Sequence, residues 1–162
     1  MMKITWNKSL FSGTYKLYQR GKPIGFLVNR TFSNTYDADI FDEKYTFLSQ
    51  GFFKQNTKII DRKKNTVIGK IEYNTWMNRA TITIDDTKFL WKFDNMWNTK
   101  WSLVNKQNEQ ISFHGTSGNG EIISEVENPL CFLCGLYVTN YNWQTATVAI
   151  AVMIPIWITL FS

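Results

Sequence analysis

The sequence is poor in the residues that build covalent frameworks and metal sites. Its 162 residues include two cysteines and one histidine, too few for a disulfide scaffold or for a zinc site with two cysteine and two histidine ligands. Any Ser-His-Asp triad would have to use His114, which lies in the glycine-rich stretch "SFHGTSGNG". We therefore expect no catalytic residues, no metal and no cofactor, and hence a protein that is not an enzyme.

Charge is missing from the C-terminal part of the chain. No Lys, Arg, Asp or Glu follows Glu127, although the chain carries a net charge of +5. The longest basic block is "DRKKN" at 61–65, so we expect no nucleic-acid partner. The N-terminus "MMKITWNKSLFSG" has no continuous apolar run, and a secretory signal would need one. With two cysteines, this favours a reducing compartment.

The chain up to Glu127 is rich in short runs typical of β-strands. In "ATITID" and "FLWKFD" apolar and polar residues alternate, which places Phe89, Trp91 and Phe93 on one face. Turn residues separate such runs, as in "RGKP", "RKKN", "NKQN" and "GTSGNG". Similar runs are "TYKLYQ", "PIGFLV", "YTFLSQ", "TKIIDR", "TVIGKIEY", "KWSLVN", "EQISFH" and "GEIISEV".

One segment of the strand-rich region occurs twice. Residues 24–47 align without a gap on residues 68–91, with identical residues that include Gly25/Gly69 and Ile40/Ile84. The shared unit is a strand with an Ile-Gly entry, a polar-aromatic connection and a hairpin. We interpret it as a structural repeat.

The number of strands decides the fold class. Antiparallel strands recur every 8–12 residues, so this region supplies roughly eleven to fifteen of them. So many strands must stack as a sandwich or close as a barrel. A barrel of about a dozen strands has room for a body about 10–12 Å wide, the diameter of a helix. We expect a mainly β protein: a closed antiparallel β-barrel of about twelve strands around a central hydrophobic α-helix.

The first part of the charge-free tail is the candidate for that helix. Asn128 is a favourable N-cap and Pro129 a favourable first helical residue, which predicts a helix over 129–142. It would be roughly 22 Å long, too short for a bilayer but long enough for a barrel axis. The pair Cys131 and Cys134 is then structural and buried rather than a redox pair. The expected core residues of this helix are Leu130, Phe132, Leu133, Leu136 and Tyr137.

A second apolar stretch follows at 145–161. Polar residues between 139 and 144 predict a hinge that separates it from the central helix. At about 26 Å it reaches the lower limit for a membrane span, but it could equally form a second core helix in a soluble protein. The sequence leaves both readings open. The candidate membrane-segment residues are Val148, Ile150, Val152, Ile154, Pro155, Trp157 and Leu160.

Together these features resemble the tubby C-terminal-like superfamily, which includes tubby proteins, phospholipid scramblases and LURP-one-related proteins. The resemblance lies in "GFFKQNTKIIDRKKNTVIGKIEYNTW", in the aromatic hairpins, and in "GEIISEVENPLCFLCGLYV", and it covers residues 15–141. It implies a closed barrel of about twelve antiparallel strands around a hydrophobic helix. The chain departs from the superfamily by adding residues 145–161. We expect a barrel domain over 1–143 and a C-terminal hydrophobic helix, a candidate membrane anchor, over 145–161.

Two functions fit these expectations. The leading hypothesis is a non-catalytic, membrane-associated barrel domain on the cytoplasmic side, with membrane phospholipids as partners. The alternative is a soluble structural or protein-interaction β-barrel with both tail helices buried. The basic residues expected near anionic headgroups in the first case are Arg62, Lys63, Lys64, Lys70 and Arg79.

Overall fold

The computed structural model describes residues 1–30, 35–49, 56–74 and 78–161, and within the C-terminal helix it describes side chains up to Thr145. The described residues form twelve strands and one helix. These elements are β1 (Met2–Lys8), β2 (Tyr15–Gln19), β3 (Lys22–Asn29), β4 (Thr35–Ile40), β5 (Glu43–Ser49), β6 (Asn56–Asp61), β7 (Thr66–Tyr73), β8 (Arg79–Ile84), β9 (Thr87–Phe93), β10 (Lys100–Asn105), β11 (Gln110–Gly115), β12 (Asn119–Ser124) and α1 (Leu130–Phe161).

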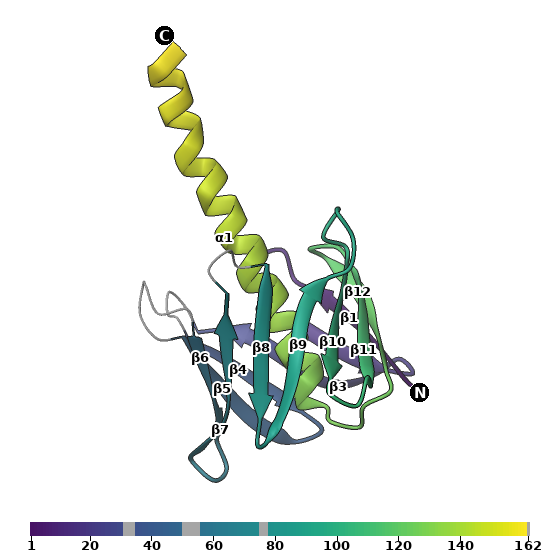
Figure 1. The fold of residues 1–162 in the computed structure, drawn as a ribbon. Helices are drawn as coiled ribbons and strands as arrows, with labels where there is room; N and C mark the ends of the chain where they lie inside the picture. Colours follow the sequence, from purple (N-terminus) through teal and green to yellow (C-terminus); the bar gives the residue numbers. More distant parts are fainter. Residues whose placement is uncertain (31–34, 50–55, 75–77, 162) are drawn as a thin grey trace.

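The strands form one closed barrel. Each pairs antiparallel with its neighbours in sequence, and β1 closes the ring by pairing with β12. The helix α1 passes through the barrel and leaves it at one end (Figure 1). The expected fold class, a closed antiparallel barrel of about twelve strands around a central helix, is confirmed. Strand β1 was not among the runs that we singled out, although Ile4 and Trp6 alternate with polar residues and are buried.

The inward side of the barrel follows the alternation seen in the sequence. In β8, Ala80, Ile82 and Ile84 are buried, and in β9 Phe89 and Trp91 face the same core. Phe93 is partly buried against that core, so the predicted common face of the β9 aromatics is confirmed. Twelve strands leave room inside for a helix, and the inward side chains pack on it.

The internal repeat is a repeat of structure. Strands β3 to β5 recur as β7 to β9, offset by 44 residues at the starts of β3 and β7 and of β5 and β9. Gly25 pairs with Ile40 as Gly69 pairs with Ile84, and the strand of each glycine carries an extra residue at a bulge, Ile24 in β3 and Ile68 in β7. A Cβ atom at Gly25 would overlap the carbonyl oxygen of Asp39. The two glycines therefore allow a close approach of backbones that a side chain would block.

Helix α1 begins at the predicted cap. The side-chain oxygen of Asn128 accepts a hydrogen bond from the backbone N–H of Leu130 at 3.2 Å, and its carbonyl accepts one from Cys131 at 3.0 Å. All residues from 130 to 140 are buried, as expected for a helix enclosed by a barrel. A Cβ atom at Gly135 would overlap the ring of Phe113, so this glycine lets the β11 aromatic lie against the helix backbone.

The two ends of the barrel differ in their relation to the helix. Lys8 at the end of β1 contacts Asn140, and Trp91 near the end of β9 contacts Thr139. Because neighbouring strands run in opposite directions, every odd-numbered strand ends where the helix leaves. We call this the helix-exit end. The even-numbered strands end at the opposite end, where β12 leads into the start of α1 (Figure 1); we call it the helix-entry end.

The predicted hinge was wrong. Residues 130–161 form one continuous helix, so the further C-terminal helix is an extension of the central one. The polar residues do not break it because they find partners: Thr139 donates to the carbonyl of Gly135 at 2.8 Å, and Thr145 donates to that of Tyr141 at 2.8 Å. Such bonds to the preceding turn are compatible with a helix.

The outward part of α1 carries the expected membrane-segment residues, whose side chains lie outside the described part of the structure. Among the residues searched, which are the described ones, no helix is long and apolar enough to cross a membrane. The residues outside this description are Val148, Ile150, Val152, Ile154, Pro155, Trp157 and Leu160.

Candidate functional site: the helix-exit end of the barrel

A buried polar cluster closes the helix-exit end around Asn140. Its side-chain oxygen accepts hydrogen bonds from the ammonium of Lys8 at 2.8 Å and the hydroxyl of Tyr15 at 3.1 Å. Its amide nitrogen donates to the hydroxyl of Tyr36 at 3.1 Å. The Tyr36 hydroxyl also donates to Gln144 at 3.5 Å. One helical residue thus links β1, β2 and β4, which fixes the depth and rotation of the helix in the barrel.

The same cluster holds a cation at the rim. The Lys8 ammonium lies 5.1 Å from the centre of the Tyr15 ring, within the range of cation–π attraction. Burial lowers the pKa of Lys8, because a partly desolvated ammonium is less stable than a hydrated one. The contacts of this cluster position the helix within the barrel.

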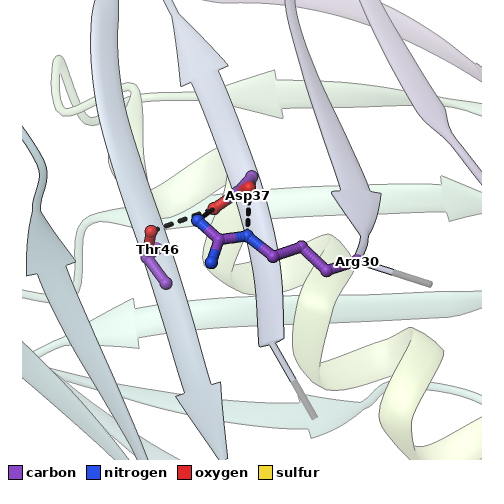
Figure 2. Close-up of polar contacts among 3 residues, drawn as sticks. All are labelled: Arg30, Asp37 and Thr46. Atoms are coloured by element: carbon purple, nitrogen blue, oxygen red, sulfur yellow. Dashed lines mark hydrogen bonds and ion pairs between the residues drawn. The ribbon is translucent and has the colours of Figure 1, made fainter. Parts of the chain in front are cut away.

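Near the helix-exit end, the charged pair Arg30 and Asp37 lies on the outer side of the barrel (Figure 2). Two nitrogens of the Arg30 guanidinium donate to the carboxylate of Asp37 at 2.6 and 3.0 Å, and the Thr46 hydroxyl donates to the same carboxylate at 3.0 Å. Burial opposes ionisation of Asp37, but these hydrogen bonds outweigh it and lower the pKa of the carboxyl. The pair joins β4 and β5 to the end of β3.

Large apolar side chains project from two connections at the helix-exit end. Leu10 and Phe11 lie between β1 and β2, and Met96 and Trp97 lie between β9 and β10. All four are at least 84% exposed. Exposed groups of this size mark contact surfaces more often than a scattered single residue does.

The basic residues predicted for lipid contact do not lie together. Arg62, Lys63 and Lys64 form the β6–β7 connection at the helix-entry end, where Lys63 pairs with Glu43 at 3.3 Å. Lys70 lies within β7 and pairs with Glu72. Arg79 begins β8 at the helix-exit end.

The expected core of the central helix is found inside the barrel. Tyr137 lies between Tyr36 and Phe47, with ring centres 5.2 and 4.8 Å away, and shares a hydrogen bond of 3.1 Å with Thr57. The other expected core residues are at most 3% exposed: Leu130, Phe132, Leu133 and Leu136.

The two cysteines are buried and unpaired, as predicted. Burial raises the pKa of Cys131 to about 12 and that of Cys134 well above its usual value. Reactive thiols need the opposite shift. Among the described residues, no group of His, Cys, Asp or Glu side chains could hold a metal ion.

Sequence reasoning missed two parts of this site. The sequence pattern assigns Asn140 to a hinge. An amide within an apolar helix nevertheless indicates hydrogen-bond partners around it, because buried polar groups are normally hydrogen-bonded. Leu10, Phe11, Met96 and Trp97 were not singled out. The sequence indicates these exposed residues only weakly, because an apolar pair between two strands is easily assigned to one of the strands.

Alkaline pH is expected to destabilise the barrel. Burial raises the pKa values of Tyr15, Tyr36, Tyr73 and Tyr137 above the ordinary value of 10.0. In the unfolded chain these phenols ionise near pH 10, so above it the unfolded chain binds fewer protons and stability falls as pH rises. Urea unfolding between pH 8 and 11 measures this slope. Tyr137→Phe should make the slope shallower, and an unchanged free energy of unfolding up to pH 11 contradicts the prediction.

A comparison of the chain with protein-family models, with curated proteins and with solved structures finds no match.

Proposed function

We propose that this chain is a non-catalytic, membrane-associated barrel domain that lies on the cytoplasmic side and contacts anionic phospholipids. The observation that carries the proposal is the course of α1. Its first part is enclosed by the barrel, and the same helix continues out of it (Figure 1). No charged residue occurs in that continuation, 145–161. A helix without charge that leaves its own domain needs another apolar environment.

The dimensions of the helix support a shallow or minimal insertion. Residues 145–161 extend about 26 Å at 1.5 Å per residue, near the lower limit for a span. The hydrogen bonds from Asn140 hold the helix in place in the barrel. An anchor continuous with the barrel core would hold the domain close to the bilayer surface in a fixed orientation. The tubby-like resemblance adds phospholipids as the expected class of partner.

Vesicle flotation tests the proposal. The full chain should float with vesicles of phosphatidylcholine and phosphatidylserine and should need detergent to stay monodisperse without them. A chain that ends at Thr145 should remain with the soluble fraction. It should still unfold cooperatively, because it keeps all buried helix residues from 130 to 140.

Two results would contradict the proposal. One is a full chain that is monodisperse without detergent and fails to float. The other is an aggregated or molten 1–145 chain, which would show that the barrel needs residues 146–161 to fold and would favour a soluble protein over a membrane anchor. As a matched control, Leu133→Asp in the full chain places a charge inside the barrel and should prevent cooperative folding while it leaves 145–161 unchanged.

A further inference from the structure

The most exposed large apolar side chains gather at one end of the barrel. Apart from Met1 at the N-terminus, the most exposed large hydrophobic residues in the described part are Phe11, Met96, Leu10 and Trp97, at 84% or more, and Val67 follows at 59%. All four belong to connections that begin where β1 and β9 end, at the helix-exit end.

These connections belong to different parts of the barrel wall. Strands β12, β11 and β10 separate β1 from β9 around the ring, so the two apolar pairs stand apart on the same rim. Figure 1 shows α1 leaving the barrel at this rim. The two loops and the emerging helix therefore define a surface rather than a single pocket.

The two ends of the barrel differ in charge. In the connections of the helix-exit end, the described residues that carry charge are Arg30, which pairs with Asp37, and Asp94, which accepts a hydrogen bond from Ser102. The connections of the helix-entry end are strongly charged and of mixed sign: Arg20, Asp42, Arg62, Lys63, Lys64, Asp85, Asp86, Lys106, Glu109, Glu125 and Glu127.

Basic residues stand just behind the apolar connections. The strand-terminal residues at the helix-exit end include Lys8, Arg79 and Lys100 and no acidic residue. Lys8 is bound to Asn140, whereas Arg79 and Lys100 are exposed. An outer layer of apolar side chains backed by cations matches the order of acyl boundary and anionic headgroups in a bilayer surface.

We infer that the helix-exit end is the membrane-docking face of the barrel. Leu10, Phe11, Met96 and Trp97 enter the boundary between headgroups and acyl chains, while Arg79 and Lys100 face anionic headgroups. The inference rests on the proposed function, because the helix that leaves at this end is the proposed anchor. A bilayer that receives the helix lies directly against this rim, and Trp side chains favour such interfaces. The basic turn 62–64 then faces away from the membrane.

Site-specific labelling of the full chain tests the docking face. Cys131 and Cys134 are buried, so a cysteine introduced at an exposed position takes the label selectively. The variants Leu10→Cys and Met96→Cys report on the helix-exit end, and Lys63→Cys and Asp86→Cys are controls at the helix-entry end. Each carries a polarity-sensitive fluorophore and is bound to phosphatidylcholine–phosphatidylserine vesicles that contain lipids with a shallow spin label.

The expected result is a blue shift and loss of emission by quenching at positions 10 and 96, with neither change at 63 and 86. Adding Phe11→Ser and Trp97→Ser to the Met96→Cys chain should abolish much of the quenching without altering urea unfolding. If the chain floats but the probes at 10 and 96 stay in water, the inferred docking face is contradicted, while the proposed membrane anchor is still supported. If probes at 63 and 86 are quenched instead, the opposite end docks. If the chain does not float, the proposed function itself fails.

Discussion

Replacing Tyr137 with alanine is expected to lower the free energy of unfolding by about 3–5 kcal/mol, the range for removing a buried aromatic ring. Tyr137 is 1% exposed and packs between Tyr36 and Phe47 inside the barrel. Its ring is therefore a large part of the contact between helix and wall. Small domains have stabilities of 5–15 kcal/mol, so the variant should be close to the limit of folding. Urea denaturation in a mild detergent, followed by tryptophan fluorescence, measures the loss.

The matched variant Tyr137→Phe separates packing from hydrogen bonding. It keeps the ring contacts and removes the bond of 3.1 Å to the buried hydroxyl of Thr57. We expect a loss of about 1–3 kcal/mol, the cost of a buried polar group without a partner. A loss for Tyr137→Ala no larger than that for Tyr137→Phe would show that ring packing contributes little, contrary to this account.

Replacing Asn140 with leucine is expected to cost about 2–3 kcal/mol. The variant replaces the amide with an apolar side chain of similar size and removes a hydrogen-bond partner from Lys8, Tyr15 and Tyr36 at once. Tyr36 keeps its bond to Gln144. The two tyrosine hydroxyls are buried, so water replaces the lost bonds poorly. Lys8 is at the rim and can turn toward solvent, which keeps the cost below the sum of three full penalties.

Asn142→Leu is the control for Asn140→Leu. Asn142 is half-buried, and its side-chain amide donates to the carbonyl of Val138 within the same helix, at 3.3 Å. Its replacement should change stability by about 0.5 kcal/mol or less. A double-mutant cycle between Asn140→Leu and Tyr15→Phe should give a coupling energy of about 0.5–3 kcal/mol. Equal losses at 140 and 142, with no coupling, would contradict the role assigned to the cluster.

The fold changes which basic residues lie near the emerging helix. The basic cluster at 62–64 was predicted to lie near anionic headgroups, but the fold places it at the end of the barrel opposite the emerging helix. Arg79 and Lys100 are isolated in sequence, but each lies at a strand terminus of the helix-exit end. A surface in a meander barrel is assembled from alternate connections, so residues about 20 positions apart in the chain share a rim.

The sequence by itself determined the strands other than β1, the repeat, the cap and the apolar helix, because each is set by neighbours along the chain. Alternation fixes which side of a strand is apolar, and the Asn-Pro pair at 128–129 starts the helix. A count of strands then left a barrel with a central helix as one of few ways to bury so much apolar surface.

Only the tertiary structure decided how the polar residues of the helix are used and which residues share an end of the barrel. Asn140 meets partners more than 100 positions away in sequence, and no local pattern distinguishes such a residue from a helix breaker. Strand β1 closes the ring against β12 from the other end of the chain. These contacts depend on strand order and register, which bring together residues that carry no signal of one another in the linear sequence.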